Sequence, residues 1–434
     1  MDSQSPISIA IIGAGIAGIT LAIALSEHNP NLHLTIYESR LRFSEISAGV
    51  GFGPNAIQGM NLISPKIAEA YESVKTSNLW PEKSNVWYDI RWGDGPKAGE
   101  LIEEVKSEKG FTHCNASRAQ FLAKLVELIP KSVEVRFGKR IIDVAEDEDD
   151  EQGRLRVRFE DGTDAYANGV VGCDGIRSAC RRILLGDDDP CANAVYSGKY
   201  AYRKVVDMKK AVQAVGTEVE NRQMYLGHGG HLLTFPIRGG KALNMVAFKD
   251  AGKTRWIQRQ WVVPSSQEAI LKDFAGFGEK PMKLLKLIED PEKWALFDTL
   301  AAPTYAKDAF CILGDAAHAT TPHLGAGAGL AIEDVHLLSG LMIPELLKSP
   351  GDIKYAFRVF DETRRPRCKD LIAKSRKQGQ LLDLQKKGGG EMTEEELRRC
   401  VEVNQKWLWE VDLKGMLDRA VVLMKSCKEA KQLY

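Results

Sequence analysis

Three glycines near the N-terminus have the spacing of a nucleotide-phosphate site. Gly13, Gly15 and Gly18 follow an apolar, β-prone run at 7–12 and precede a stretch suited to a helix. In such a turn the first glycine permits the bend, the second lets the backbone approach a pyrophosphate, and the third lets helix and strand pack closely. The N–H groups at the start of the helix attract the phosphates. Glu38 ends the next strand, so we predict a dinucleotide site in which Glu38 binds a ribose.

A second segment with chemical potential lies about 300 residues further along the chain. Asp315 follows a predicted buried strand at 309–313, and a glycine-rich loop then leads into a helix predicted at 329–347. An aspartate there can reach a ribityl hydroxyl, and the positive end of the helix would stabilise the negative charge of reduced flavin. A simple nicotinamide dehydrogenase needs no such second segment. The pair therefore favours FAD, although Arg40 would suit the 2′-phosphate of NADP.

The elements that must position these residues have an α/β pattern. Strands at 7–12 and 32–37 flank a helix at 19–25, which predicts a Rossmann-like βαβ start. The stretch 43–56 is expected to be an ordered loop, and the acidic run 146–151 a solvated hairpin tip. The remaining elements predicted for this part are a helix at 117–129 and strands at 133–144, 155–159 and 166–171.

The pattern changes after residue 195 to short alternating strands, which predict an inserted antiparallel sheet with one solvated face. We expect strands at 200–206, 222–226, 231–237 and 242–248, followed by a helix at 267–287. The predicted domains are therefore an FAD-binding domain at 1–195 and 300–375, some of whose strands are shared with the substrate side, a substrate-binding β-sheet domain at 196–299, and a C-terminal helical segment at 376–434.

The C-terminal segment begins with a glycine-containing stretch, 384–392, that we expect to be a flexible break. Thr393 and Glu396 then have the spacing of a capping box, which predicts a helix through Trp407 and Trp409. That helix could serve oligomerisation or pack on the first domain. We expect a monomer or a homodimer.

Composition favours a small-molecule partner. The formal net charge is zero, so no long-range field favours nucleic acid or an anionic membrane. The eight cysteines form no CxxC pair, and His318 and His323 lack further ligands at metal-site spacing, so we expect no metal. The N-terminus shows no secretory pattern and no run of 18 apolar residues occurs, so we expect a cytoplasmic protein without a membrane span.

Three separated motifs make the chain resemble the class A flavoprotein aromatic hydroxylases, such as p-hydroxybenzoate and salicylate hydroxylases. They are the first glycine motif with Glu38, the sequence Gly-Cys-Asp-Gly-Ile-Arg-Ser at 172–178, and Gly-Asp-Ala-Ala-His at 314–318 with Pro322. The resemblance extends from residue 7 to about residue 375. Within the class the chain is most similar to fungal salicylate-hydroxylase-like enzymes that act on polyketide phenols.

The resemblance implies roles for individual residues. Asp174 would serve the FAD pyrophosphate and transient NAD(P)H, and Arg118 would contact the FAD diphosphate. Leu324 stands where the family often has a polar residue, which puts details of flavin movement in doubt. The other residues implied at the flavin are Gly51, Asp315, Pro322, Gly327 and Ala328.

The resemblance also implies the chemistry. NAD(P)H would reduce FAD, O₂ would add at flavin C4a, and the hydroperoxide would hydroxylate an electron-rich phenolic ring. The family places a substrate arginine at the segment 200–203, so Arg203 is the candidate that favours the phenolate. His231 is a candidate hydrogen-bond partner of the substrate, and Tyr225 or Phe235 could line the pocket.

The sequence leaves several reactions and substrates open. Arg203 could instead anchor the carboxylate of salicylate, whose hydroxylation releases CO₂. Dearomatising hydroxylation, epoxidation on the same motifs, and a non-catalytic flavoprotein are further alternatives. The sequence does not distinguish NADH from NADPH.

Overall fold

The apolar run before the first glycine motif forms β1 (Ser8–Ile12), which lies inside a six-stranded sheet. The computed structural model describes residues 6–43, 49–107, 111–386 and 392–432. Neighbouring strands of the sheet are parallel except for the last pair, β19–β20. Its order is β8 (Glu134–Phe137), β2 (His33–Glu38), β1, β12 (Gly169–Gly172), β20 (Phe310–Ile312) and β19 (Ala306–Lys307).

Helices bury this sheet. The predicted helix at 19–25 is α1 (Ile16–His28), and α10 (Gly327–Leu341) packs against it, so both helices are almost wholly buried. The isoleucines of β1 are buried as well, as expected for a parallel strand covered on its faces. The Rossmann-like fold predicted from the sequence is confirmed. α10 begins two residues before and ends six residues before the predicted helix.

The inserted sheet has eight strands instead of the four predicted, because two come from the first 110 residues and two more lie at 262–264 and 292–299. β14 pairs with β5 in parallel, and all other neighbouring strands are antiparallel. The order is β17 (Val262–Pro264), β18 (Glu292–Thr299), β13 (Ala194–Asp207), β16 (Ala242–Asp250), β15 (Gly230–Ile237), β14 (Gln223–Gly227), β5 (Val86–Trp92) and β6 (Leu101–Lys106).

Two further expectations need correction. The stretch 267–287 forms two helices, α7 (Gln267–Asp273) and α8 (Glu279–Leu285), because Gly276 and Gly278 interrupt the helical pattern. The stretch 133–144 contributes to two different sheets, since the chain turns at Gly138, whose φ is +72°.

One face of the eight-stranded sheet is covered by α6 (Met208–Val215), α7 and α8. Alternate side chains of the strands point to the opposite face of the eight-stranded sheet. This face lies against loops that follow strands of the six-stranded sheet, at Gly49 and at His323. The acidic run predicted as a hairpin tip lies at the turn between β9 (Ile141–Glu146) and β10 (Leu155–Phe159). The remaining elements are β3 (Gly49–Phe52), β4 (Lys75–Ser77), β7 (Cys114–Ser117), β11 (Asp164–Ala167), α2 (Pro54–Ile63), α3 (Pro65–Glu72), α4 (Arg118–Glu127), α5 (Ala179–Leu185), α9 (Asp315–His318) and the 3₁₀ turns η1 (Pro81–Lys83), η2 (Thr217–Glu220), η3 (Pro322–Leu324) and η4 (Pro350–Asp352).

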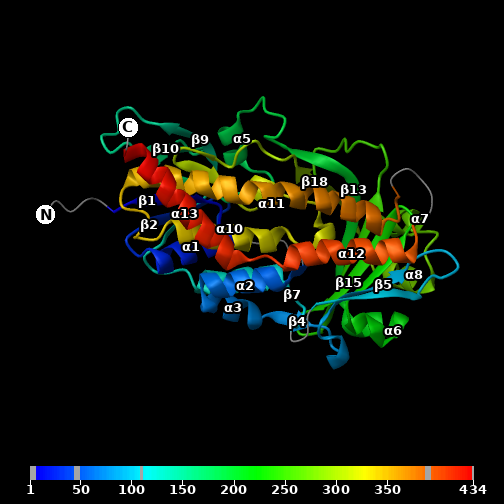
Figure 1. Ribbon diagram of the computed structural model, residues 1–434. Coiled ribbons are helices and arrows are strands. Elements are labelled where there is room, and N and C mark those ends of the chain that lie inside the picture. The colour runs from blue at the N-terminus through cyan, green and yellow to red at the C-terminus, as the bar shows by residue number, and fades with distance from the viewer. Residues whose placement is uncertain (1–5, 44–48, 108–110, 387–391, 433–434) are drawn as a thin grey trace.

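A 30-residue helix, α11 (Ile353–Leu382), runs along the molecule from the first sheet to the second (Figure 1). It continues through Pro366 and across the predicted domain boundary at residue 375. Near its first end the Asp361 carboxylate accepts a hydrogen bond from the backbone N–H of Tyr305, beside the six-stranded sheet.

The C-terminal helices, α12 (Glu394–Trp409) and α13 (Leu413–Gln432), pack back on their own chain (Figure 1). The predicted capping box of Thr393 and Glu396 is confirmed. Trp409 contacts Trp87 of β5, with ring centroids 6.0 Å apart. Residues 44–48 of the predicted loop and 387–391 of the predicted break lie outside the described residues.

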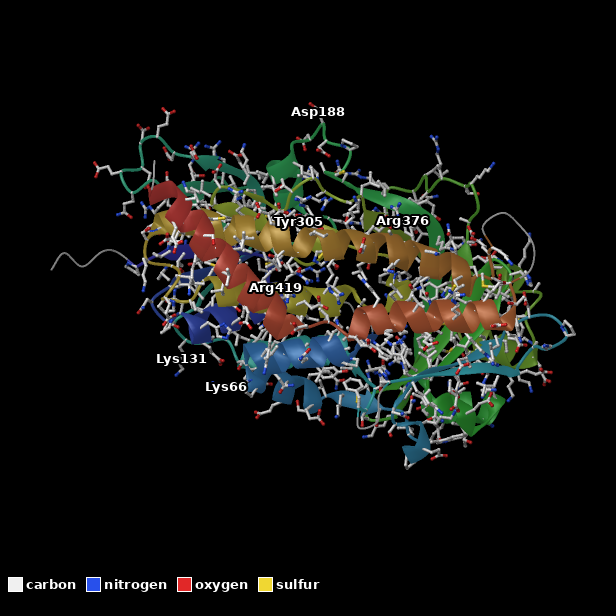
Figure 2. The ribbon with its side chains drawn as sticks, viewed as in Figure 1. Lys66, Lys131, Asp188, Tyr305, Arg376 and Arg419 are labelled. Carbon is white, nitrogen blue, oxygen red and sulfur yellow. The ribbon has the colours of Figure 1, made fainter. Side chains whose placement is uncertain are left out.

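The outside of the molecule carries charged side chains, among them Lys66, Lys131, Asp188 and Arg419, which are exposed to solvent (Figure 2). No helix among the described residues is long and apolar enough to cross a membrane. All eight cysteines are free.

Candidate active site

The first glycine turn has the shape of a phosphate cradle. A Cβ on Gly13, where φ is +106°, would lie 2.6 Å from the Cys173 carbonyl oxygen, and a Cβ on Gly18 would overlap the Gly13 carbonyl. Both positions therefore need glycine for close packing. A Cβ on Gly15 would meet nothing within 4 Å. Gly15 is the N-cap of α1 and offers no side-chain cap, so free N–H groups face this open side and a pyrophosphate fits there.

Glu38 lies beside this turn at the end of β2. One carboxylate oxygen accepts a hydrogen bond of 2.8 Å from the Ala14 N–H, and the other accepts one of 2.8 Å from the Arg40 N–H. The oxygen bonded to Arg40 also accepts a hydrogen bond of 3.2 Å from the Ser39 hydroxyl, whereas the oxygen bonded to Ala14 can accept a second one from a ribose hydroxyl. The structure thus brings Glu38 to the cradle as the spacing predicts.

Asp174 has a structural task that the sequence did not indicate. Its carboxylate accepts hydrogen bonds from the Ser178 hydroxyl at 2.5 Å and from the backbone N–H groups of Ala179 at 2.7 Å and Cys180 at 3.0 Å. These bonds satisfy the first turn of α5. Burial raises the pKa of Asp174. A contact of Asp174 with FAD or NAD(P)H remains a prediction.

The second cofactor segment converges on the start of α10. Asp315 begins α9, and a Cβ on Gly327 would lie 3.6 Å from its Oδ1 atom. Ala326, the N-cap of α10, provides no side-chain cap, so N–H groups are free beside Asp315. A ribityl hydroxyl and an anionic flavin edge fit this pair of features. Ala328 lies in the same first turn, and Pro322 opens the preceding turn η3.

A buried network of ion pairs holds the segment around Gly314 and His318 in place. Asp334 of α10 accepts hydrogen bonds from His318 at 2.5 Å, from the Gly314 N–H at 2.9 Å and from Arg364 at 2.7 Å. Although burial opposes it, the Asp334 charge raises the pKa of His318 well above its usual value. Neighbouring Glu333 pairs with Arg364 at 2.8 Å.

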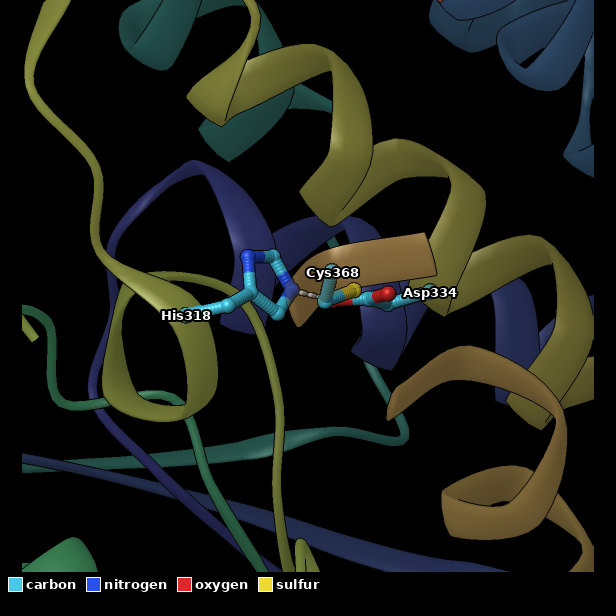
Figure 3. A group of neighbouring side chains, drawn as sticks. All are labelled: His318, Asp334 and Cys368. Atoms are coloured by element: carbon cyan, nitrogen blue, oxygen red, sulfur yellow. Dashed lines mark hydrogen bonds and ion pairs between the residues drawn. The ribbon is translucent and has the colours of Figure 1, made fainter. Parts of the chain in front are cut away.

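His318, Asp334 and Cys368 also form the one cluster of possible metal ligands within the described ranges, with ligand atoms within 4.8 Å of one another (Figure 3). The Asp334 carboxylate is already occupied, and the Arg364 guanidinium contacts it directly. A cation beside a buried guanidinium would be repelled. The cluster therefore acts as a structural ion network that holds Gly314 and α9 in place.

Arg203 and Arg118 lie close enough to influence each other. Burial lowers the pKa of Arg203, and the positive charge of Arg118 lowers it further. The Arg203 guanidinium lies 5.3 Å from the centre of the Trp294 ring, and within the described part of the chain no carboxylate pairs with it. Two neighbouring cations create a positive field suited to the FAD diphosphate or to a phenolate.

Arg203 shares its sheet face with an apolar strip. Three apolar residues lie in register with Arg203 on the next three strands: Val246 of β16, Leu233 of β15 and Met224 of β14. These three residues are the apolar strip. His231 lies one row to one side of this strip, and Phe235 lies one row to the other side. The predicted residues Arg203, His231 and Phe235 therefore line one surface.

Tyr225 does not share this face. It belongs to the core under α6, α7 and α8, and its hydroxyl lies 3.3 Å from Glu218. Strand periodicity explains the difference, because Tyr225 is one residue away from Met224, whose side chain points to the opposite side. The sequence interpretation did not assign the register, so Tyr225 is removed from the candidate pocket.

His231 belongs to a buried network where the large sheet meets α11 and the loop 319–326. We call this loop, which joins α9 to α10, the flavin loop, because the resemblance implies flavin contacts beside it. Its Nδ1 atom lies 2.6 Å from the carboxylate of Asp383, which also pairs with Lys199 of β13. The His231 ring stacks on Phe248 and meets His323 of η3, with ring centroids 5.3 Å apart. Burial lowers the pKa of both histidines, so both rings are neutral.

Arg222, which no sequence motif indicates, is buried on the strip side of the sheet, just before β14. Its guanidinium stacks 3.6 Å from the centre of the Trp87 ring and lies 5.4 Å from that of Phe235. Trp87 also approaches the flavin loop, since a Cβ on Gly325 would lie 3.3 Å from its ring. Arg222 precedes a short strand without any motif, so only its burial in three dimensions identifies it.

Comparisons with known proteins show to which family the chain belongs. A family model described as FAD binding domain matches residues 119–351, and one described as NAD(P)-binding Rossmann-like domain matches residues 11–45. The sequence is 38% identical over 433 residues to 6-methylsalicylate 1-monooxygenase of Aspergillus terreus, covering 99% of this chain and 95% of that protein. The chain belongs to the FAD-dependent monooxygenases.

Further similar proteins support this family assignment. A salicylate hydroxylase of Pseudomonas putida is 34% identical, with 95% of this chain and 94% of that protein covered. A solved salicylate hydroxylase substrate complex superposes with a TM-score of 0.85 at 31% identity, covering 96% of this chain and 99% of that one. The predicted resemblance, the FAD cofactor and the NAD(P)H co-substrate of this monooxygenase are confirmed.

Proposed function

We propose that this monooxygenase hydroxylates a phenolic aromatic compound, with a polyketide phenol as the substrate class. The supporting observation is that Arg203 and His231 border one apolar strip, on the sheet face that meets the flavin loop at His323. Bound FAD supplies electron transfer from NAD(P)H and activation of O₂. The chain itself binds the ring, favours the phenolate and excludes water.

The protein residues divide this work. Arg203 provides a cation for the phenolate oxygen in surroundings where burial strengthens the attraction. His231 donates from Nδ1 to Asp383, which leaves a lone pair on the buried Nε2 atom that has no partner in the described part of the chain. That lone pair can accept the phenol proton, and Leu233 and Val246 provide a dry surface for the ring.

A second candidate is decarboxylative hydroxylation of a 2-hydroxybenzoate. It is supported by the names of two relatives, 6-methylsalicylate 1-monooxygenase and salicylate hydroxylase. Both candidates use the same cofactor and the same face of the sheet. They differ in whether the ring carries a carboxylate and whether CO₂ is released.

A substrate panel tests the proposal. The purified protein should be yellow, and its NAD(P)H oxidation should rise on addition of phenols, with one oxygen atom found in the product by mass spectrometry. Resorcinol-type aldehydes and salicylates should be scored for CO₂ release and for loss of ring absorbance. If no phenol stimulates NAD(P)H oxidation in the FAD-loaded protein, the proposed function is wrong.

A further inference from the structure

Arg222 carries a buried positive charge on the face of the large sheet that bears the apolar strip. Among the residues that the structure describes, its buried Nε and Nη1 atoms have no hydrogen-bond partner and no carboxylate forms an ion pair with it. Burial lowers its pKa to about 10, and its strongest electrostatic neighbours are Tyr71, Tyr88 and Cys114 rather than an acid. An unpaired buried guanidinium is costly, so its presence indicates an anion that arrives with a ligand.

Other unpartnered polar groups surround this arginine. The Nδ2 and Oδ1 atoms of Asn115 and the Nδ2 atom of Asn244 are buried and have no hydrogen-bond partner in the described part of the chain. A Cβ on Gly51 would lie 2.9 Å from Asn115 Oδ1 and 3.1 Å from Arg222 Nη2. We call Trp87, Asn115, Arg222, Phe235 and Asn244 the Arg222 cluster. It combines one cation and free amide donors with two aromatic walls.

The position of the Arg222 cluster in the fold indicates which anion it binds. The phosphates of FAD fit the glycine turn of the six-stranded sheet, which is a different part of the fold. The cluster instead borders the apolar strip, because Phe235 lies one row from Leu233 on the same strand. A planar carboxylate matches the fork of a guanidinium, and the aromatic walls suit the ring that carries it.

We propose that the Arg222 cluster binds the carboxylate of an aromatic acid substrate whose ring lies on the apolar strip. Arg222 shares the sheet face of the strip, because it lies two residues before Met224, and its strand is three spacings, about 14 Å, from that of Arg203. This inference rests on the proposed function and deepens it. It favours a hydroxybenzoate over a neutral phenol as the substrate.

The test compares salicylate with salicylamide, which has nearly the same shape but no charge. Dissociation constants are measured by calorimetry and by flavin absorbance on the FAD-loaded enzyme. The wild-type protein should prefer salicylate by about a hundredfold, as expected when a buried charge pair is lost. Arg222→Met should reduce this preference to less than about tenfold, and Arg222→Lys should retain part of it.

Thermal unfolding provides a readout that does not depend on activity. Without substrate, Arg222→Met should melt no lower than the wild-type protein, since it removes an unpaired buried charge. Salicylate should raise the melting temperature of the wild-type protein but not that of the variant. Arg91→Gln is the matched control, because Arg91 on neighbouring β5 is already bonded to Gln223 and Gly99. It should keep the wild-type preference.

The outcomes separate the two proposals. An unchanged salicylate preference in Arg222→Met and Arg222→Lys would overturn the carboxylate site. So would a wild-type protein that hydroxylates neutral phenols and binds salicylate no better than salicylamide, although the hydroxylase function would then stand. A change only in FAD affinity would assign Arg222 to the flavin and also overturn the inference. A protein that responds to no phenol defeats both proposals.

Discussion

His231 Nδ1 lies 2.6 Å from Asp383 Oδ1, although the two residues are 152 positions apart in the chain. The contact joins β15 to the residue that follows α11, and Lys199 pairs with the same carboxylate. An anionic partner at Nδ1 fixes the proton there and leaves Nε2 as the acceptor. The contact therefore orients the candidate base.

Asp383→Asn should lower turnover by about a hundredfold, the size of a general-base contribution. Loss of the Asp383 charge should also lower the pKa of His231 further, since that charge now raises it against burial. The acidic limb of the pH–rate profile should shift to lower pH. Asp250→Asn is the control, because Asp250 lies 3.7 Å from Lys199 and does not bond His231. A variant that is merely less stable, with an unshifted profile, would contradict the role.

Arg203→Gln should leave the FAD content unchanged and reduce coupled hydroxylation by about a hundredfold or more, through loss of electrostatic stabilisation of the phenolate. NAD(P)H oxidation and product formation should be measured together, because a poorly held substrate yields H₂O₂ instead of product. Normal coupling in this variant would remove Arg203 from the catalytic residues.

Gly15→Ala and Gly18→Ala should fail in different ways. A methyl group on Gly15 meets no protein atom within 4 Å, so the variant should fold and melt like the wild-type apoprotein but lose FAD affinity. A methyl group on Gly18 would overlap the Gly13 carbonyl, so that variant should be destabilised by about 1–3 kcal/mol, as for overpacking in a core. FAD titration and chemical denaturation of the apoproteins distinguish the two. Full FAD affinity in Gly15→Ala would place the pyrophosphate elsewhere.

His113 should make stability depend on pH. Burial, and then the positive charge of Arg222, lower its pKa to about 2, so it stays neutral in the folded protein. The unfolded chain binds a proton below pH 6.5, and stability falls with decreasing pH by about 1.4 kcal/mol per unit for this group. His113→Leu should take up about one proton fewer on unfolding between pH 6 and pH 4. Equal slopes of unfolding free energy against pH would refute this assignment.

Local pattern predicted where the candidate cofactor residues lie in the fold. Gly13, Gly15, Gly18 and Glu38 act within one continuous βαβ unit, where spacing determines position. Asp315 was also placed correctly beside the start of α10, since a strand, a turn and a helix follow one another directly.

The substrate side depends on pairings that local pattern does not contain. β5 joins the large sheet beside β14, more than 130 residues away, and brings Trp87 to Arg222. Tyr225 was misplaced because one residue of register moves a side chain to the opposite face. Asp383 could not be linked to His231, because α11 continues through Pro366, where a helix is expected to end.

The continuity of α11 limits how this enzyme can be rebuilt from parts. At one end the helix is bonded to Tyr305 next to the Rossmann-like sheet, and at the other it positions Asp383 against His231. Each residue of a helix adds a rotation of about 100°, so a single insertion would turn Asp383 away from β15. Chimaeras that exchange the substrate sheet between relatives should therefore carry the last turns of α11 with it, and should keep its length unchanged.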